Sequence, residues 1–323
     1  MRRKLLLLFK FVLSGVLLYW LFKRGDLTLN NLTIGLSNVK LVVVVLLFKV
    51  AQLLLGSYRS ALLMQFQTIS FKIVKRVVSI TWAASFLNCV LPSSIFGEAY
   101  RIQKLMKVDP SINKDNAVYA VIFTKIFSIM SLLFVATVPS FFVQSVSSEG
   151  RLYFYLLYCF IGISILALLF RERVIKMLKP LFLVSYRFRK GEFFKRRLNA
   201  LGQYHVGLLR SNKLIVSSLL SIVIQTLNVI SVVLIVMVLN EGVEIDIYKV
   251  LVSVPIGLLA QAIPISFMGL GVGHVAFDKL LRTCGVSNGA DVFTVFFVLS
   301  YLYYLIGAIP MFCNAKCGDR KDD

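Results

Sequence analysis

The chain carries one pattern twice: a proline interrupts an apolar run, and a cluster of serine, glycine and ionisable residues follows. In the first copy Pro92 makes the interruption and a long apolar run ends at Pro139; the corresponding residues of the second copy are Pro264 and Pro310. The two prolines are 47 residues apart in the first copy and 46 in the second. Broken apolar segments at corresponding places in two halves are typical of secondary transporters, whose sites lie where the halves meet. The repeat therefore predicts a membrane protein built from two similar halves.

Hydrophobic residues make up 58% of the 323 residues, above the roughly 45–50% typical of a soluble domain. Several apolar runs reach the roughly 18–20 residues needed to cross a bilayer. The predicted fold class is an all-α polytopic membrane protein. We predict about six full spans, at 5–22, 41–64, 117–143, 152–170, 214–239 and 290–313.

We expect a single membrane domain over 1–323, with no separate soluble catalytic domain. Repeat 1 covers about 41–143, a basic loop covers 171–213, and repeat 2 covers about 214–313. The net charge of +21 would suggest nucleic acid in a soluble chain. Here cytoplasmic basic loops facing anionic lipid explain it more simply, so we expect no nucleic-acid partner.

Two further apolar runs, 77–91 and 250–263, look too short to cross. Each has about 14–15 residues before its proline, so a helix of that length covers little more than about 20 Å of a hydrocarbon core about 30 Å thick. Irregular backbone at membrane depth persists only where protein or a water-filled cavity covers it. We therefore predict two Pro/Gly-broken re-entrant helical hairpins.

The distribution of positive charge supports this topology and sets its orientation. With both hairpins re-entrant and both termini cytoplasmic, the inside segments hold 25 Lys and Arg residues and the outside segments hold 7. If 77–91 crossed fully, the basic loop 171–213 would lie outside, against the positive-inside rule. The two repeats then have opposite topology in a cell inner (plasma) membrane, and their hairpins meet near the midplane. The alternative is an old duplication kept only for packing.

The basic loop 171–213 mixes Lys and Arg with leucine and aromatic residues. This pattern predicts a cytoplasmic amphipathic helix lying on an anionic membrane surface. A solvated loop that only obeys the charge rule is the alternative.

The first motif follows Pro92 and offers a site for an anion. Serine can cap the helix after the break, and Gly97 permits close approach of the backbone. The free N–H groups at a helix N-terminus suit a phosphate. Glu98 and Arg101 lie one turn apart, so the alternative is a helix cap with a satisfied ion pair. The candidate residues are Ser93, Ser94, Gly97, Glu98 and Arg101.

The second motif repeats the design after Pro264. Its alternating glycines are not a nucleotide fingerprint, because no βαβ unit surrounds them; they suit a tight turn or backbone that lines a ligand path. His274 could titrate near neutral pH, or it could simply be a histidine with one hydrogen-bonded partner. The candidate residues are Ser266, Gly269, Gly271, His274 and Asp278.

Lys49 and Lys125 lie well inside predicted spans, where a charge costs about 2.5–3.5 kcal/mol on insertion scales. The functional interpretation is a cationic pocket for a lipid phosphate, and the alternative is an ion pair with Glu98. Lys10 and Arg59 lie near enough to the ends of their spans to extend towards the interface.

The sequence contains no motif for hydrolysis, metal binding or nucleotide chemistry, and only two histidines. We therefore predict that the protein is not an enzyme and that it has no cofactor and no metal site.

At the two motifs the chain resembles the flippase-like transmembrane family typified by the membrane part of lysylphosphatidylglycerol synthase, the multiple peptide resistance factor. The residues that match its two signatures are Pro92, Gly97, Glu98 and Arg101, then Pro264, Ser266, Gly269 and Gly271. His274 falls where the family more often has glutamate. The resemblance covers nearly the whole chain and implies a translocator of phospholipid or polyprenyl-linked lipid. The family's soluble aminoacyl-transfer domain is missing, so lysyl transfer is not implied.

The favoured hypothesis is an inner-membrane, flippase-like lipid transporter that moves or binds an anionic phospholipid or polyprenyl-linked lipid. Glu98 and His274 would hold or gate the headgroup, which the serines, Arg101 and Lys125 would contact. One alternative is a secondary transporter of a small polar solute. The other is a non-transporting subunit that presents lipid to a membrane transferase.

Overall fold

A computed structural model describes residues 28–64, 70–91, 94–108, 114–143, 212–262 and 269–312, together with Tyr19 and Lys23. These residues form helices and the turns between them. The predicted span 5–22 apart from Tyr19, the predicted span 152–170 and almost all of the basic loop 171–213 lie outside the described residues.

The same order of helices occurs twice, after a short helix α2 (Leu29–Ser37). The first set is α3 (Val39–Leu63), α4 (Phe71–Val90), α5 (Ser94–Met106) and α6 (Lys114–Ser140). The second set is α10 (Lys213–Leu239), α11 (Ile247–Ala262), α12 (Val272–Arg282) and α13 (Gly289–Leu305). In each set the first and last helices flank a pair. The second helix of that pair, α5 or α12, is the shortest of its set.

Five described helical segments are long and apolar enough to cross a membrane: Val39–Leu63, Phe71–Val90, Asn116–Ser140 within α6, Lys213–Leu239, and Gly289–Phe312, which is α13 with the turn and short helix that follow it. Four of them coincide with predicted spans, which confirms an all-helical polytopic membrane protein over these residues.

The fifth, α4, corrects the predicted length of the first short run. The helix begins at Phe71 instead of 77, with the Ser70 hydroxyl accepting a hydrogen bond from the Ile73 amide. Its 20 residues span about 30 Å at 1.5 Å per residue, so the length argument for re-entry fails for this hairpin and its re-entry stays a prediction. The run looked shorter because exposed basic residues occupy its first turns. Helix α11, with 16 residues, remains below that length.

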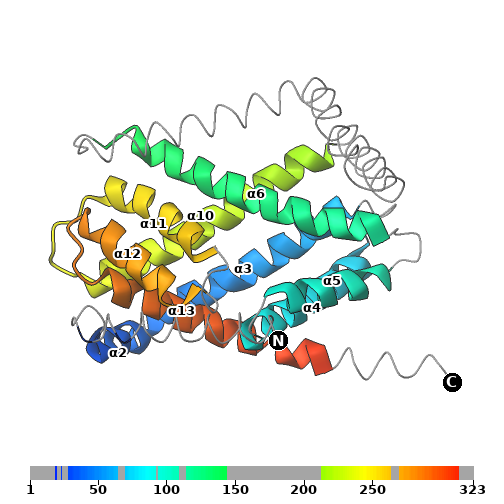
Figure 1. The fold of residues 1–323 in the computed structure, drawn as a ribbon, viewed down its shortest axis with the longest axis horizontal. Helices are drawn as coiled ribbons and strands as arrows, with labels where there is room; N and C mark the ends of the chain where they lie inside the picture. Colours follow the sequence, from blue (N-terminus) through cyan, green and yellow to red (C-terminus); the bar gives the residue numbers. More distant parts are fainter. Residues whose placement is uncertain are drawn as a thin grey trace, which may run out of the picture.

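Each short helix packs back against the helix before it, so α4–α5 and α11–α12 form two hairpins. The first hairpin connects the end of α3 to the start of α6. The second begins where α6 ends, because the rings of Phe142 and Tyr248 stack there with centroids 5.5 Å apart. The bases of the two hairpins therefore lie at opposite ends of α6 (Figure 1).

Two apolar cores hold the helices together. One gathers residues of α10, α11, α12 and α13, with Phe277, Phe293 and Leu299 fully buried. The other lies among α3, α4, α5 and α6 around Leu63, Met64 and Leu105. Helix α10 packs along α3 and α6 and joins the two halves. The site described below lies beside the second core.

Candidate functional site

A cavity of about 290 Å³ opens among α3, α4, α5, α6 and α13. Most of its lining side chains are polar. They are Arg59, Thr81, Ala84, Ser85, Asn88, Cys89, Glu98, Arg101, Thr124, Lys125, Ser128 and Tyr304. The charged members are three cations and one carboxylate, so two positive charges remain when the lining is taken together.

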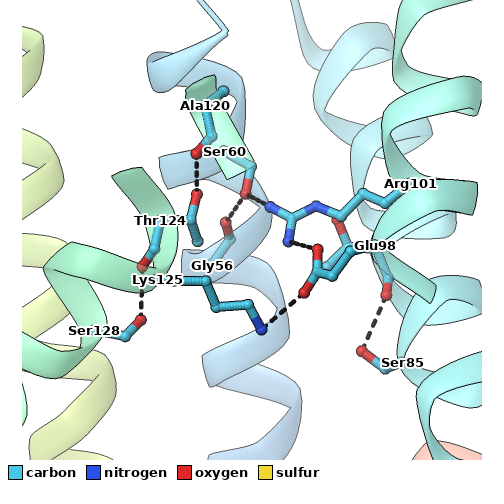
Figure 2. Close-up of polar contacts among 10 residues, drawn as sticks. Gly56, Ser60, Ser85, Glu98, Arg101, Ala120, Thr124, Lys125 and Ser128 are labelled. Carbon is cyan, nitrogen blue, oxygen red and sulfur yellow. Dashed lines mark hydrogen bonds and ion pairs between the residues drawn. The ribbon is translucent and has the colours of Figure 1, made fainter. Parts of the chain in front are cut away.

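Glu98 lies between two of the cations. One carboxylate oxygen is 2.7 Å from Lys125 Nζ, and the other is 3.5 Å from an Arg101 Nη (Figure 2). The Glu98 side chain is 18% exposed, whereas that of Lys125 is 59% exposed. Lys125 is therefore the accessible end of this ion-pair chain, and Arg101 is its buried end.

Arg101 is anchored by helix α3 as well as by Glu98. Its second Nη donates to the Ser60 hydroxyl at 2.5 Å, and that hydroxyl donates to the Gly56 carbonyl at 2.7 Å (Figure 2). Its Nε has no hydrogen-bond partner among the described residues. The guanidinium is thus fixed in direction and keeps donor capacity that the described residues do not use.

Arg59 adds a third cation that has no carboxylate partner in the described part of the chain. It is 5% exposed, and it donates to the Ser221 hydroxyl of α10 at 2.6 Å. Its Nε, like that of Arg101, is unpartnered within the described ranges, and the two guanidinium groups repel each other. The expectation that Arg59 extends to the interface is wrong, because the side chain turns into the helix bundle.

Close packing between α4 and α5 brings these charges together. Gly97 is buried, and a Cβ at this position would collide with the Ala84 carbonyl oxygen and the Asn88 amide. Glycine lets α5 lie directly against α4, and Glu98 and Arg101 follow it on the next turn. The predicted close approach of the backbone at Gly97 is confirmed.

The first motif and Lys125 therefore meet at one cavity, and the pairing of Glu98 with Lys125 and Arg101 is confirmed. These ion pairs neutralise only part of the positive charge of the cavity, because Arg59 takes no part in them. Ser93 and the side chain of Ser94 lie outside the described residues, as does Ser266. The sequence did not lead us to assign Arg59 or Asn88 to the site. The one feature that marks them in the sequence is that each is a polar residue within an apolar run.

The second motif forms a tight turn at the other hairpin. Gly269 and Gly271 have φ of +79° and +80°, the left-handed region that favours glycine. His274 Nδ1 accepts a hydrogen bond from the Gly271 amide at 3.3 Å. Its Nε2 is 3.1 Å from the Thr294 hydroxyl, which itself donates to a backbone carbonyl. Nε2 must then be the donor, so the network fits a neutral imidazole.

His274 thus has the satisfied structural partners that the alternative interpretation predicted, and neither it nor the two glycines line the cavity. Asp278 lies one turn further along α12, with one carboxylate oxygen 3.0 Å from Arg282 Nε. A ligand role for these four residues stays a prediction.

Lys49 lies apart from the cavity, in the contact between α3 and α10. It is 3% exposed, donates to Asn228 Oδ1 at 3.0 Å, and lies 4.2 Å from the centroid of the Phe296 ring. Among the described residues, an amide oxygen and an aromatic face stabilise the ammonium, and no carboxylate pairs with it. The proposed ion pair of Lys49 with Glu98 is not formed.

No cluster of three or more potential metal ligands occurs within the described ranges. The cavity offers charge and hydroxyl groups, which suit recognition of an anion.

The fold and the site define a polytopic helical membrane protein with a cationic cavity between its helices. A family model described as the lysylphosphatidylglycerol synthase TM region matches residues 7–309, and the chain belongs to this family. The resemblance inferred from the two motifs is therefore confirmed. Neither a curated protein nor a solved structure shows significant similarity to the chain.

Proposed function

We propose that the protein binds the anionic headgroup of a membrane lipid in this cavity and moves the lipid between the leaflets of the cell inner membrane. The observation that carries the proposal is the cavity itself: three cations, Arg59, Arg101 and Lys125, against a single carboxylate. Charged groups within a membrane are costly and mark sites of function. Here the excess is positive, so the ligand is an anion.

The surface beside the cavity favours a lipid over a small solute. On α6, Lys125 is flanked by Ile122, Ile126 and Ile129, which are 44–46% exposed. Phe96, on α5, is 53% exposed. Exposed apolar side chains around an accessible amine fit acyl chains lying along α6 while the headgroup reaches inwards.

In this proposal the lipid headgroup crosses the membrane between the two hairpins. Their bases lie at opposite ends of α6, so we infer that α4–α5 and α11–α12 dip into the membrane from opposite sides as inverted repeats. Both termini are then cytoplasmic, and the loop 171–213 lies on the anionic inner surface. Translocation needs no covalent step, so the protein acts without an enzyme's catalytic group or a cofactor.

A dithionite-quench assay in proteoliposomes tests this function with two fluorescent anionic lipids, phosphatidylglycerol and phosphatidic acid. The wild-type chain is expected to expose inner-leaflet lipid to the quencher. Lys125→Gln removes the accessible cation and should slow exposure by about tenfold, the effect of losing about 1.4 kcal/mol of charge-assisted binding.

Lys107→Gln is the matched control, because Lys107 is exposed at the end of α5 and does not line the cavity. It should match the wild-type rate. If liposomes with the wild-type chain expose neither lipid faster than empty liposomes do, transport is rejected. Lipid binding retained in that case would favour the lipid-presenting alternative.

A further inference from the structure

The charge of the cavity defines the kind of anion that it takes. Glu98 neutralises one of the three cations, with its two oxygens shared between Lys125 and Arg101. The guanidinium groups also donate to neutral side chains: Arg101 to Ser60, and Arg59 to Ser221. Among the described residues, the lining therefore keeps two uncompensated positive charges, carried by two buried guanidinium groups and the exposed Lys125 amine.

We propose that the cavity selects a lipid whose headgroup is a phosphomonoester, a group with close to two negative charges, over lipids with a singly charged phosphodiester. The inference rests on the proposed function and names its substrate class. A monoester carries about −1.5 to −2 at pH 7 and three strong acceptor oxygens. The charge of a monoester neutralises the two excess positive charges of the cavity lining, whereas a diester leaves one of them uncompensated.

The donors around the cavity suit three acceptor oxygens. Arg59 and Arg101 approach from the buried side, and each keeps an Nε–H without a partner in the described part of the chain. Lys125 approaches from the accessible side. Guanidinium groups bind phosphate through paired, planar donors, while an ammonium acts as a point charge that adapts to its partner.

The size of the cavity is compatible with a phosphate group. The volume of about 290 Å³ is just below the roughly 300–1,000 Å³ of small-molecule sites. A phosphate group at the end of a lipid fits such a space. The buried Gly97 contact between α4 and α5 fixes one wall, so the cavity does not widen easily.

The Glu98 carboxylate occupies a position next to Lys125 for which an oxygen atom of the ligand would compete. At 2.7 Å the ion pair uses one of the three N–H donors of that amine and leaves the others for a ligand. Removing the carboxylate raises the uncompensated charge from two to three. Removing Lys125 lowers it to one. The two substitutions are expected to change the preference for a dianion in opposite directions.

The experiment measures binding of short-chain lipids to the full chain in detergent by isothermal titration calorimetry. The probes are dioctanoyl phosphatidic acid, dioctanoyl phosphatidylglycerol and, as a neutral-headgroup control, dioctanoyl phosphatidylcholine. Wild type is expected to bind the phosphomonoester at least about tenfold more tightly than the phosphodiester, since removing one charge-assisted hydrogen bond weakens binding by about one power of ten. In Lys125→Gln the ratio should fall towards one, and in Glu98→Gln phosphatidic acid should bind more tightly than to wild type.

Lys107→Gln, which removes a positive charge from the same helix region outside the cavity, should keep the wild-type ratio. If wild type binds the two anionic lipids equally tightly and Lys125→Gln weakens the binding of both, the monoester preference is wrong. The cavity would then still be a site for anionic lipids in general. A ratio unchanged in Lys125→Gln would also overturn it.

Inorganic phosphate and glycerol 3-phosphate separate a lipid headgroup from a free phosphate. Weak or undetectable binding of both, beside tight binding of phosphatidic acid, supports the lipid. Binding of inorganic phosphate as tight as that of phosphatidic acid, with no effect of the acyl chains, would reject the lipid and the proposed function together.

Discussion

Arg101→Ala is expected to reduce lipid transport by about 100-fold, the largest loss for any single change in the cavity. The substitution removes a cation that is 7% exposed and is held by Glu98 and Ser60. Hydrogen bonds to charged groups are worth about 1.5–3 kcal/mol each, and about 2.8 kcal/mol is a hundredfold in affinity. Lys125 still pairs with Glu98, so the carboxylate is not left as an isolated buried charge.

The dithionite assay measures this loss, and Arg101→Lys separates charge from geometry. Lysine keeps the positive charge but lacks the forked donors that reach Ser60 and Glu98 together. It should restore part of the transport, while Lys107→Ala should cause no loss. A rate within twofold of wild type for Arg101→Ala would show that transport does not use this cavity.

Gly97→Ala is expected to cause the largest loss of stability. The added methyl group would collide with the Ala84 carbonyl oxygen and with Asn88, so α5 must move away from α4. Overpacking of this kind costs about 1–3 kcal/mol, and sometimes more. Thermal unfolding in detergent, followed by circular dichroism, should show a lower midpoint than wild type, together with weaker binding of anionic lipid.

Gly56→Ala is the matched control on the neighbouring helix α3. A Cβ at Gly56 would meet only the Ile224 side chain, at an ordinary contact distance of 3.9 Å. Its unfolding midpoint should stay close to that of wild type. Equal midpoints for Gly97→Ala and Gly56→Ala would contradict the close α4–α5 contact that places Glu98 and Arg101.

The meeting of Glu98, Arg101 and Lys125 could be predicted because each is a charge within or beside an apolar run. A charge in such a place needs a partner, and Glu98 was the available carboxylate. Arg59 could not be placed in this way, because its position near the end of a span is equally compatible with extension to the interface. Its partner, Ser221, is 162 residues away, and only the tertiary structure brings the two together.

The lengths of helices were harder to predict than their existence. Lys72, Lys75 and Arg76 lower the hydropathy at the start of α4, so the apolar run seemed to begin at 77. The helix nevertheless includes them, since all three side chains are exposed and leave the buried face of the helix apolar. At the second motif, the glycine pattern suited either a tight turn or a ligand path, and a histidine with a structural partner was one of two interpretations of His274. The sequence could not decide between them, because Thr294, one of the partners of His274, lies 20 residues further along the chain.

Transport, unlike binding alone, requires the two hairpins to reach the centre from opposite sides, and the proposed function depends on this arrangement. Single cysteines at Lys107, after α5, and Ser287, after α12, test it most directly in a chain whose five native cysteines are replaced by serine. Both positions are exposed in the structure. A membrane-impermeant maleimide applied to intact cells is expected to label Ser287→Cys and to leave Lys107→Cys unlabelled until the cells are opened. Labelling of both positions from the same side would contradict the inverted arrangement.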